Sequence, residues 1–229
     1  MSKNLSLVRE PRRTSVKPSI ATTTLGPTDW VKRSFDLSLG LAIAALCLPL
    51  IALIAICVRF TSPGPVFFSH ERIGRGGRVF RAWKFRTMIA DADAALERML
   101  AEDPALRAEW RQSHKLKRDP RVTRVGGLLR QSSLDELPQL WNVLWGEMSL
   151  VGPRPIVEAE VPKYRHEYEL YQRVRPGMTG MWQVSGRNDT SYAERVRLDA
   201  YYVRHWSVWL DLYILTATVR VVLLRSGAY

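Results

Sequence analysis

The longest stretch without a charged side chain covers residues 37–58, LSLGLAIAALCLPLIALIAICV. Inside a bilayer a chain has no water to satisfy its backbone, and a helix satisfies its backbone hydrogen bonds within one segment. At about 1.5 Å per residue, a helix of this length reaches across the roughly 30 Å hydrocarbon core. By length alone, the run therefore predicts one membrane-spanning helix.

Two features of the run favour a re-entrant hairpin instead. Pro49 lies just past the middle, where proline removes a backbone hydrogen bond and bends a helix. Basic residues flank both ends, with Lys32 and Arg33 before the run and Arg59 after it. Because a spanning helix would carry one basic flank across the membrane, we expect residues 35–58 to form a helix–break–helix with its break at Pro49. A single spanning helix stays the alternative.

Composition divides the chain into three segments. Residues 1–29 are rich in Ser, Thr, Pro and basic residues without an apolar period, which is typical of a disordered basic tail. Residues 30–60 hold the membrane hairpin, and residues 61–229 are expected to form a small cytosolic domain. The predicted fold class is α+β and mostly α, with the re-entrant hairpin, a short β-hairpin and amphipathic helices at the membrane interface.

Periodicity and turn residues predict the elements of this domain. Two extended runs, residues 66–73 and 78–88, flank a glycine-containing turn and predict the β-hairpin. Helical patterns are assigned to longer stretches. These are residues 89–112, interrupted at Pro104, then 157–173 and 190–205, with a Gly-rich loop at 175–189.

The last apolar stretch, residues 206–229, admits two interpretations. Asp211 interrupts it, and Trp206, Trp209 and Tyr213 gather near its start. Tryptophan and tyrosine favour the headgroup region of a membrane, which predicts an interfacial helix lying in the membrane plane. A buried core helix is the alternative.

The chain is strongly basic, with a formal net charge of +12. This balance suits an anionic partner such as nucleic acid, phospholipid headgroups or a phosphorylated substrate. The sequence contains no zinc-ligand spacing and no ribonucleoprotein signature, so we expect no nucleic-acid partner. Cys47 and Cys57, the only cysteines, both lie in the apolar run and suggest neither a metal site nor a disulfide framework.

An adjacent acid pair, Asp135 and Glu136, stands out against this basic background. Ser133 and Glu136 have the spacing of a capping box, which predicts that the pair lies in the first turn of a helix, and simple capping is one interpretation. Because adjacent carboxylates repel each other, a divalent cation or basic residues would offset their charge. A carboxylate can also attack phosphorus and form a covalent intermediate.

Basic residues near the pair in the sequence are candidates for binding phosphate. Arginine holds phosphate oxygens through two parallel hydrogen bonds, and lysine does so as a point charge. The candidates are Lys84, Arg86, Arg130, Arg154 and Arg187.

Four ordered blocks resemble the bacterial sugar transferases, the monotopic phosphoglycosyl transferases. The blocks are the Pro-broken apolar run after KRSFD, then KFRTM, RQSSLDELPQLWNVLWGEMSLVGPRP and RPGMTGMWQVSGR. The resemblance covers about residues 30–229 and is closest to the short type that initiates exopolysaccharide synthesis. One departure is His70, where many members carry glutamine.

The resemblance implies an activity and roles for residues. The expected enzyme transfers a hexose 1-phosphate from a UDP-sugar to undecaprenyl phosphate and releases UMP, and residues 61–229 form its catalytic domain. Asp135 would be the nucleophile, Glu136 would help hold Mg²⁺, and the pair together would form the metal site. The expected phosphate- and substrate-binding residues are Lys84, Arg86, Arg130, Arg154, Gln183 and Arg187.

The resemblance also implies the surroundings of this enzyme. Its partners would be a UDP-hexose, undecaprenyl phosphate and phospholipids, at the cytoplasmic face of a bacterial inner membrane. Galactose or glucose is the expected sugar, and an N-acetylated sugar stays open, as does assembly into a homo-oligomer. A different class of protein, a non-catalytic one that binds membrane surfaces or nucleic acid through charge alone, is the alternative function.

Overall fold

The computed structural model describes residues 27–113, 116, 119–186 and 190–223, so residues 1–26 of the predicted tail lie outside the described part. Helices make up most of the described chain, as predicted. The α-helices are α1 (Pro27–Thr61), α2 (Ala92–Glu102), α3 (Pro104–Ser113), α4 (Arg124–Ser132), α5 (Gln139–Trp145), α6 (Val161–Tyr164), α7 (Tyr168–Gln172), α8 (Met181–Val184), α9 (Tyr192–Arg204) and α10 (Val208–Leu223). Strands β1 (Phe67–Ile73), β2 (Val79–Phe85), β3 (Ser149–Val151) and β4 (Gly177–Thr179) and 3₁₀ helices η1 (Arg75–Gly77), η2 (Leu134–Glu136), η3 (Glu158–Glu160) and η4 (Arg165–Glu167) complete the fold.

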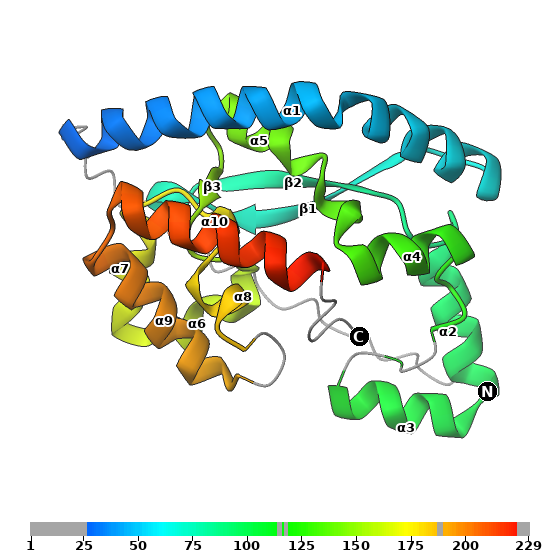
Figure 1. Ribbon diagram of the computed structural model, residues 1–229. Helices are drawn as coiled ribbons and strands as arrows, with labels where there is room; N and C mark the ends of the chain where they lie inside the picture. Colours follow the sequence, from blue (N-terminus) through cyan, green and yellow to red (C-terminus); the bar gives the residue numbers. More distant parts are fainter. Residues whose placement is uncertain (1–26, 114–115, 117–118, 187–189, 224–229) are drawn as a thin grey trace.

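Helix α1 runs without interruption through Pro49, so the predicted break into two helices is not found. A proline removes one hydrogen bond from a helix, and the turns on both sides of Pro49 are apolar and keep their own bonds. Packing holds the two halves to the same domain: Ala44 belongs to one buried cluster, and Ile51 and Val58 belong to another. Figure 1 shows α1 lying along one side of the molecule, past α5 and towards α4.

The opposite face of α1 is apolar and exposed. Of the described helices, the segment Asp29–Thr61 is long and apolar enough to cross a membrane. Large side chains stand on this face although the domain covers none of them, which marks a surface for lipid or another apolar partner. They include Leu37, Leu41, Leu46, Leu48, Leu53, Ile56 and Phe60.

The predicted β-hairpin is confirmed. Strands β1 and β2 pair antiparallel, with Phe67 opposite Phe85 and Ile73 opposite Val79. Between them Gly76 and Gly77 both adopt positive φ values, 67° and 73°, which glycine reaches at little cost. This turn fixes the register and therefore decides which side chains share a face of the hairpin.

A second, parallel pair of strands was not predicted. Ser149 of β3 pairs with Gly177 of β4. Strand β4 lies within residues 175–189, which were expected to form a Gly-rich loop. The backbones come very close here, since a Cβ atom on Gly177 would lie 2.1 Å from the nitrogen of Gly152. Three-residue strands carry too little alternation to be read from sequence, so only the tertiary contact reveals them.

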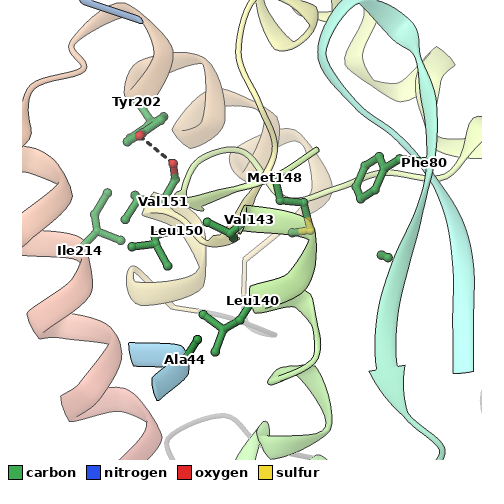
Figure 2. Packing of buried hydrophobic residues seen from close by; sticks show 10 residues of the cluster. Ala44, Phe80, Leu140, Val143, Met148, Leu150, Val151, Tyr202 and Ile214 are labelled. Atoms are coloured by element: carbon green, nitrogen blue, oxygen red, sulfur yellow. Dashed lines mark hydrogen bonds between the residues drawn. The ribbon is translucent and has the colours of Figure 1, made fainter. Parts of the chain in front are cut away.

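The main buried cluster lies between these strands and the helices around them. Figure 2 shows Leu140 and Val143 of α5 packed beside Leu150 of β3 and Ile214 of α10. The hydroxyl of Tyr202 donates a hydrogen bond to the carbonyl oxygen of Val151 at 2.9 Å. This cluster joins α1, α5, β3, α9 and α10 into one core.

The helical predictions have mixed outcomes. The helix interrupted at Pro104 and the helix at 190–205 are confirmed as α2, α3 and α9. The stretch expected to be helical at 157–173 is helical but divided into four short pieces, η3, α6, η4 and α7. Arg165 takes a φ of 49°, outside the helical range, so the axis cannot continue through it.

Helix α10 combines the two interpretations of the last apolar stretch. One face is core, since Asp211 and Ile214 are fully buried. The other face is open, with Trp209 80% and Tyr213 59% exposed. The helix therefore has an apolar aromatic face available to a membrane and a second face committed to the core.

A buried ion pair network ties α1 to α10. The ammonium of Lys32 lies 3.1 Å from Asp36 and 2.7 Å from Asp211, and both carboxylates are fully buried. Asp36 also accepts hydrogen bonds from the hydroxyl of Ser149 and the backbone of Leu150. Lys32 thus compensates two buried negative charges, one on its own helix and one on α10, 179 positions further along the chain.

Replacing Lys32 with methionine should destabilise the fold strongly, because it leaves both carboxylates uncompensated. Removing one partner of a buried pair costs about 3–5 kcal/mol. The melting temperature in detergent should fall by about 2–4 °C for each kcal/mol. Arg98→Met on the exposed face of α2 is the control. Equal melting temperatures for Lys32→Met and the control would contradict this role.

Candidate active site

The acid pair lies in η2, a single turn between α4 and α5. Ser133 adopts a left-handed conformation with φ 57° and ends α4, and its side chain caps nothing. The predicted capping box is therefore wrong. A helix that began at Leu134 would need a backbone N–H from Pro138 in its second turn, and proline has none. Helix α5 therefore begins only after this proline.

Lys84 of β2 lies between the two carboxylates. Its ammonium is 2.6 Å from Glu136 Oε1 and 3.4 Å from Asp135 Oδ2. The side chain of Asp135 is 11% exposed, that of Glu136 27% and that of Lys84 28%. The single cation therefore offsets the repulsion of two adjacent negative charges, and it favours Glu136 by distance.

The two carboxyl groups have pKa values displaced in opposite directions. Burial raises the pKa of Asp135, and the charge of Glu136 adds to this rise against the opposing effects of Lys84 and Arg130. Burial also acts to raise the pKa of Glu136, but Lys84, Arg154 and Arg72 outweigh it and hold that pKa below its ordinary value. A pair separated in this way can take two different chemical roles.

A cleft opens beside the pair. Its empty volume is about 370 Å³, including the part open to solvent. Four predicted site residues that are far apart in the sequence meet in this cleft: Lys84, Glu136, Arg154 and Gln183. Its lining is His70, Arg72, Ala82, Lys84, Glu136, Gln139, Arg154, Pro155, Gly177, Met178 and Gln183.

Two lining residues, Arg72 and Gln139, were missed by the sequence analysis. In the hairpin register Phe68 pairs with Lys84, and Arg72 is four positions after Phe68 on the same face. Strand alternation could therefore have predicted that Arg72 shares a face with Lys84, because residues two or four positions apart in a strand point to the same face. Gln139, 4% exposed, carried no such signal, since only the end of η2 places it in the cleft.

Arg72 and Arg154 bring two positive charges to this cleft. Burial lowers the pKa of Arg72, and the charge of Arg154 lowers it further. Two guanidinium groups held near each other are stabilised by an anion between them, and phosphate matches their hydrogen-bonding geometry. The cleft therefore combines the carboxylate of Glu136 with three cations, Lys84 included. Asp135 does not line the cleft itself, but it lies beside it, 3.4 Å from the ammonium of Lys84.

The remaining predicted binding residues differ in position. Arg130, at the end of α4, donates from Nε to the hydroxyl of Thr87 at 2.9 Å and acts on Asp135 through its charge. Arg86 is buried and faces elsewhere: its guanidinium donates to the carbonyls of Ser62 and Pro63 and anchors the end of α1. Arg187 lies outside the described residues.

A larger hollow of about 600 Å³ is lined in part by Ser149 and Val151 of β3. Its charged lining residues pair mainly among themselves, Lys32 with Asp36 and Arg75 with Asp29. The acid pair is not part of its lining. The smaller cleft is therefore the candidate active site, because there the charges face an open space.

The sequence that forms this site matches a known family. The family model described as bacterial sugar transferase matches residues 27–225, which include α1, the acid pair and the cleft. The chain belongs to the bacterial sugar transferase family. The expectation drawn from the four sequence blocks is thereby confirmed.

Relatives of this sugar transferase fall into two length classes. The exopolysaccharide production protein ExoY of Rhizobium meliloti is 50% identical over 198 residues, 86% of this chain and 88% of that protein. The UDP-galactose-lipid carrier transferase of Erwinia amylovora is 52% identical over 200 residues, 87% of this chain but 42% of that protein. The UDP-glucose:undecaprenyl-phosphate glucose-1-phosphate transferase of Escherichia coli is 38% identical over 232 residues, 98% of this chain and 47% of that protein. The chain thus spans less than half the length of these two longer relatives.

Opposite pKa displacements predict opposite effects of two isosteric substitutions. At pH 7 Asp135→Asn should raise the melting temperature, because it removes a buried charge whose pKa is raised. This gain should shrink as the pH falls through that raised pKa, where Asp135 is already neutral. Glu136→Gln should lower the melting temperature at pH 7, because it removes a charge that the folded state favours, and this loss should shrink in acid. Melting curves at pH 7 and pH 4 test both signs, and a destabilised Asp135→Asn at pH 7 would contradict the assignment.

Proposed function

We propose that this sugar transferase moves a hexose 1-phosphate from a UDP-hexose to undecaprenyl phosphate, releasing UMP, as the first step of an exopolysaccharide repeat unit. The observation that carries the proposal is the acid pair bridged by Lys84 at a cleft that also holds Arg72 and Arg154. The names of relatives support the two substrates, since they include an undecaprenyl-phosphate galactose phosphotransferase and a UDP-glucose:undecaprenyl-phosphate glucose-1-phosphate transferase.

Asp135 is the proposed nucleophile. A carboxylate oxygen of Asp135 attacks the β-phosphorus of the UDP-hexose, and the bond from this phosphorus to the bridging oxygen breaks, so UMP leaves with the electron pair. An oxygen of undecaprenyl phosphate then attacks the same phosphorus and releases the carboxylate of Asp135. A partly desolvated carboxylate suits this role, because fewer water molecules must leave before it attacks.

The basic residues of the cleft offset the charge of the phosphates. Arg72 and Arg154 suit phosphate oxygens, and Lys84 holds Glu136 while remaining close to Asp135. Fixed positive charges at such a site stabilise the negative charge that moves between oxygens during each displacement. When Asp135 bonds to phosphorus, it loses its charge and its ion pair with Lys84. The ammonium of Lys84 can then interact with the departing or incoming phosphate.

Magnesium fits the donor set of this site. Mg²⁺ commonly takes one or two protein carboxylates and completes its coordination with water and substrate phosphates. Asp135 and Glu136 are two such carboxylates on one turn, and among the described residues no group of three His, Cys, Asp or Glu forms a closed metal cage. Asp135 and Glu136 would hold the ion, which would supply further positive charge to the phosphates.

The packing of α1 and α10 supports a membrane arrangement in which the enzyme enters the bilayer from one side. Both halves of α1 pack on the same domain, so a helix crossing the bilayer would have to pull one half away from its buried partners. A helix embedded from one side, with a bend at Pro49, keeps these contacts and leaves both basic flanks on one face. Trp209 and Tyr213 of α10 would lie in the headgroup region. We place the enzyme at the cytoplasmic face of a bacterial inner membrane.

Galactose or glucose is the proposed sugar. Relatives named for galactose reach 52% and 48% identity, and relatives named for glucose reach 38% and 40%. A panel of UDP-galactose, UDP-glucose and UDP-N-acetylglucosamine, with undecaprenyl phosphate and UMP detection, decides between these donors.

Asp135→Ala and Asp135→Asn should lose essentially all UMP release, by at least about 10³-fold, because no other group can replace the nucleophile. Glu136→Gln should be severely impaired, and excess chelator should stop the wild-type enzyme. The exposed Glu97→Gln on α2 is the control and should keep full activity. A phosphohexose adduct on Asp135, found by mass spectrometry after mixing with the donor alone, would support the two-step route. Near-normal turnover by a folded Asp135→Ala enzyme rules it out.

A single cysteine placed within residues 1–25, in a background with Cys47 and Cys57 replaced by serine, tests the one-sided membrane arrangement. A membrane-impermeant thiol reagent added to intact cells should leave this cysteine unlabelled, and labelling should appear after permeabilisation. Labelling in intact cells would mean that α1 spans the bilayer and would overturn the one-sided arrangement.

A further inference from the structure

Trp182, a residue with no role in the function proposed above, contacts Arg154, which lines the cleft. It is the second residue of α8 and is 5% exposed. The guanidinium carbon of Arg154 lies 5.7 Å from the centroid of its ring. Arg195 of α9 lies over the same indole at 4.5 Å. The ring therefore joins the loop after β3 to α9 through two cation–π contacts.

Arg154 lies among charges of both signs: Arg72 repels its guanidinium, whereas Glu136 and Asp199 attract it. Its backbone is restricted by Pro153 and Pro155, and the carbonyl of Pro153 accepts a hydrogen bond from Gly177 at 2.8 Å. Its side chain, however, is long and exposed, and the like charge of Arg72 repels it within the same cleft. A free arginine side chain would reduce this repulsion by turning to solvent.

An indole ring opposes that movement. Its negative face attracts a guanidinium group and restricts its rotamers without forming a hydrogen bond, so all five N–H donors stay available. The position over Trp182 is compatible with an effect on the acid pair, because the charge of Arg154 lowers the pKa of Glu136. Trp182 itself does not line the cleft, whereas its neighbour Gln183 does.

We propose that Trp182 is a positioning residue: its indole holds the guanidinium of Arg154 towards the cleft, and it acts on the sugar-nucleotide donor only through Arg154. The proposal rests on the transferase function above. The tryptophan of the GMWQVSGR segment has this role because its aromatic face attracts a cation, which an aliphatic side chain of similar size does not do.

The first measurement compares substitutions of Trp182. Trp182→Leu removes the ring, and Trp182→Phe keeps a smaller one. Trp182→Leu should raise KM for the UDP-hexose about five- to tenfold with a smaller change in kcat, the size expected when one cation–π contact is lost. Trp182→Phe should retain most of the affinity. Equal KM values for Trp182→Leu and wild type would overturn the proposal.

A matched control exists elsewhere in the chain. Arg121 lies 5.5 Å from the ring centroid of Trp110 on α3, the same kind of contact outside the cleft. Trp110→Leu should therefore leave KM for the donor unchanged. A rise in KM equal to that of Trp182→Leu would mean that the effect comes from general loosening of the fold, and it would also overturn the proposal.

A double-mutant cycle with Arg154→Ala separates positioning from a purely structural role. If Trp182 acts through Arg154, adding Trp182→Leu or Trp182→Phe to Arg154→Ala should cause no further rise in KM. A further rise of several-fold in the double mutant would show a role independent of Arg154 and would contradict the proposal. If Trp182→Leu does not fold, the cycle is run with Trp182→Met, which also removes the ring.

Direct binding keeps this test separate from the proposed function. Calorimetry with UDP measures affinity for the diphosphate without requiring turnover, and the same cycle is applied to its Kd. If wild-type enzyme releases no UMP with any UDP-hexose, the proposed function fails, while UDP binding still reports on the Trp182–Arg154 coupling. If UMP is released but the two substitutions are additive in both KM and Kd, only the positioning role fails.

Discussion

The ammonium of Lys84 between Asp135 and Glu136 is the interaction on which the site depends. Two adjacent carboxylates in one turn repel each other and resist burial. One cation shared between them lets the turn pack against the core. Burial raises the pKa of Asp135, whereas Lys84, together with Arg154 and Arg72, lowers the pKa of Glu136. The pair therefore consists of one carboxyl group with a raised pKa and one with a lowered pKa, which is a functional asymmetry obtained from two nearly identical side chains.

The β-hairpin and the strands around the cleft place Lys84 beside that turn. The hairpin of β1 and β2 carries Lys84 and Arg72 on one face, and its glycine turn sets the register that aligns them. The parallel contact of β3 and β4 brings Arg154 to the opposite wall of the cleft. Trp182 extends the same principle, because a side chain that touches no substrate decides where a charged one lies.

The exposed apolar face of α1 and the cleft share one scaffold. Lys32 fixes the start of α1 to α10 through buried carboxylates, and Arg86 fixes its end through the carbonyls of Ser62 and Pro63. With both ends held, the apolar face of α1 stays at a constant position relative to the cleft. Such a connection suits an enzyme whose donor is soluble in water and whose proposed acceptor is confined to the bilayer.

The sequence by itself determined the elements with long or strong signals: the apolar helix, the β-hairpin, the interruption at Pro104 and the identity of the acid pair. Local spacing gave a wrong prediction at Ser133, where a capping box was expected and a left-handed residue was found. It was also insufficient at Arg86, which was expected to bind phosphate and instead donates to the backbone carbonyl of Ser62. Only the tertiary structure decided that α1 stays continuous at Pro49, that Arg72 joins the cleft and that β3 meets β4. The physical reason is that periodicity and propensity act over a few residues, whereas charge compensation and backbone contact act between segments that meet only after folding.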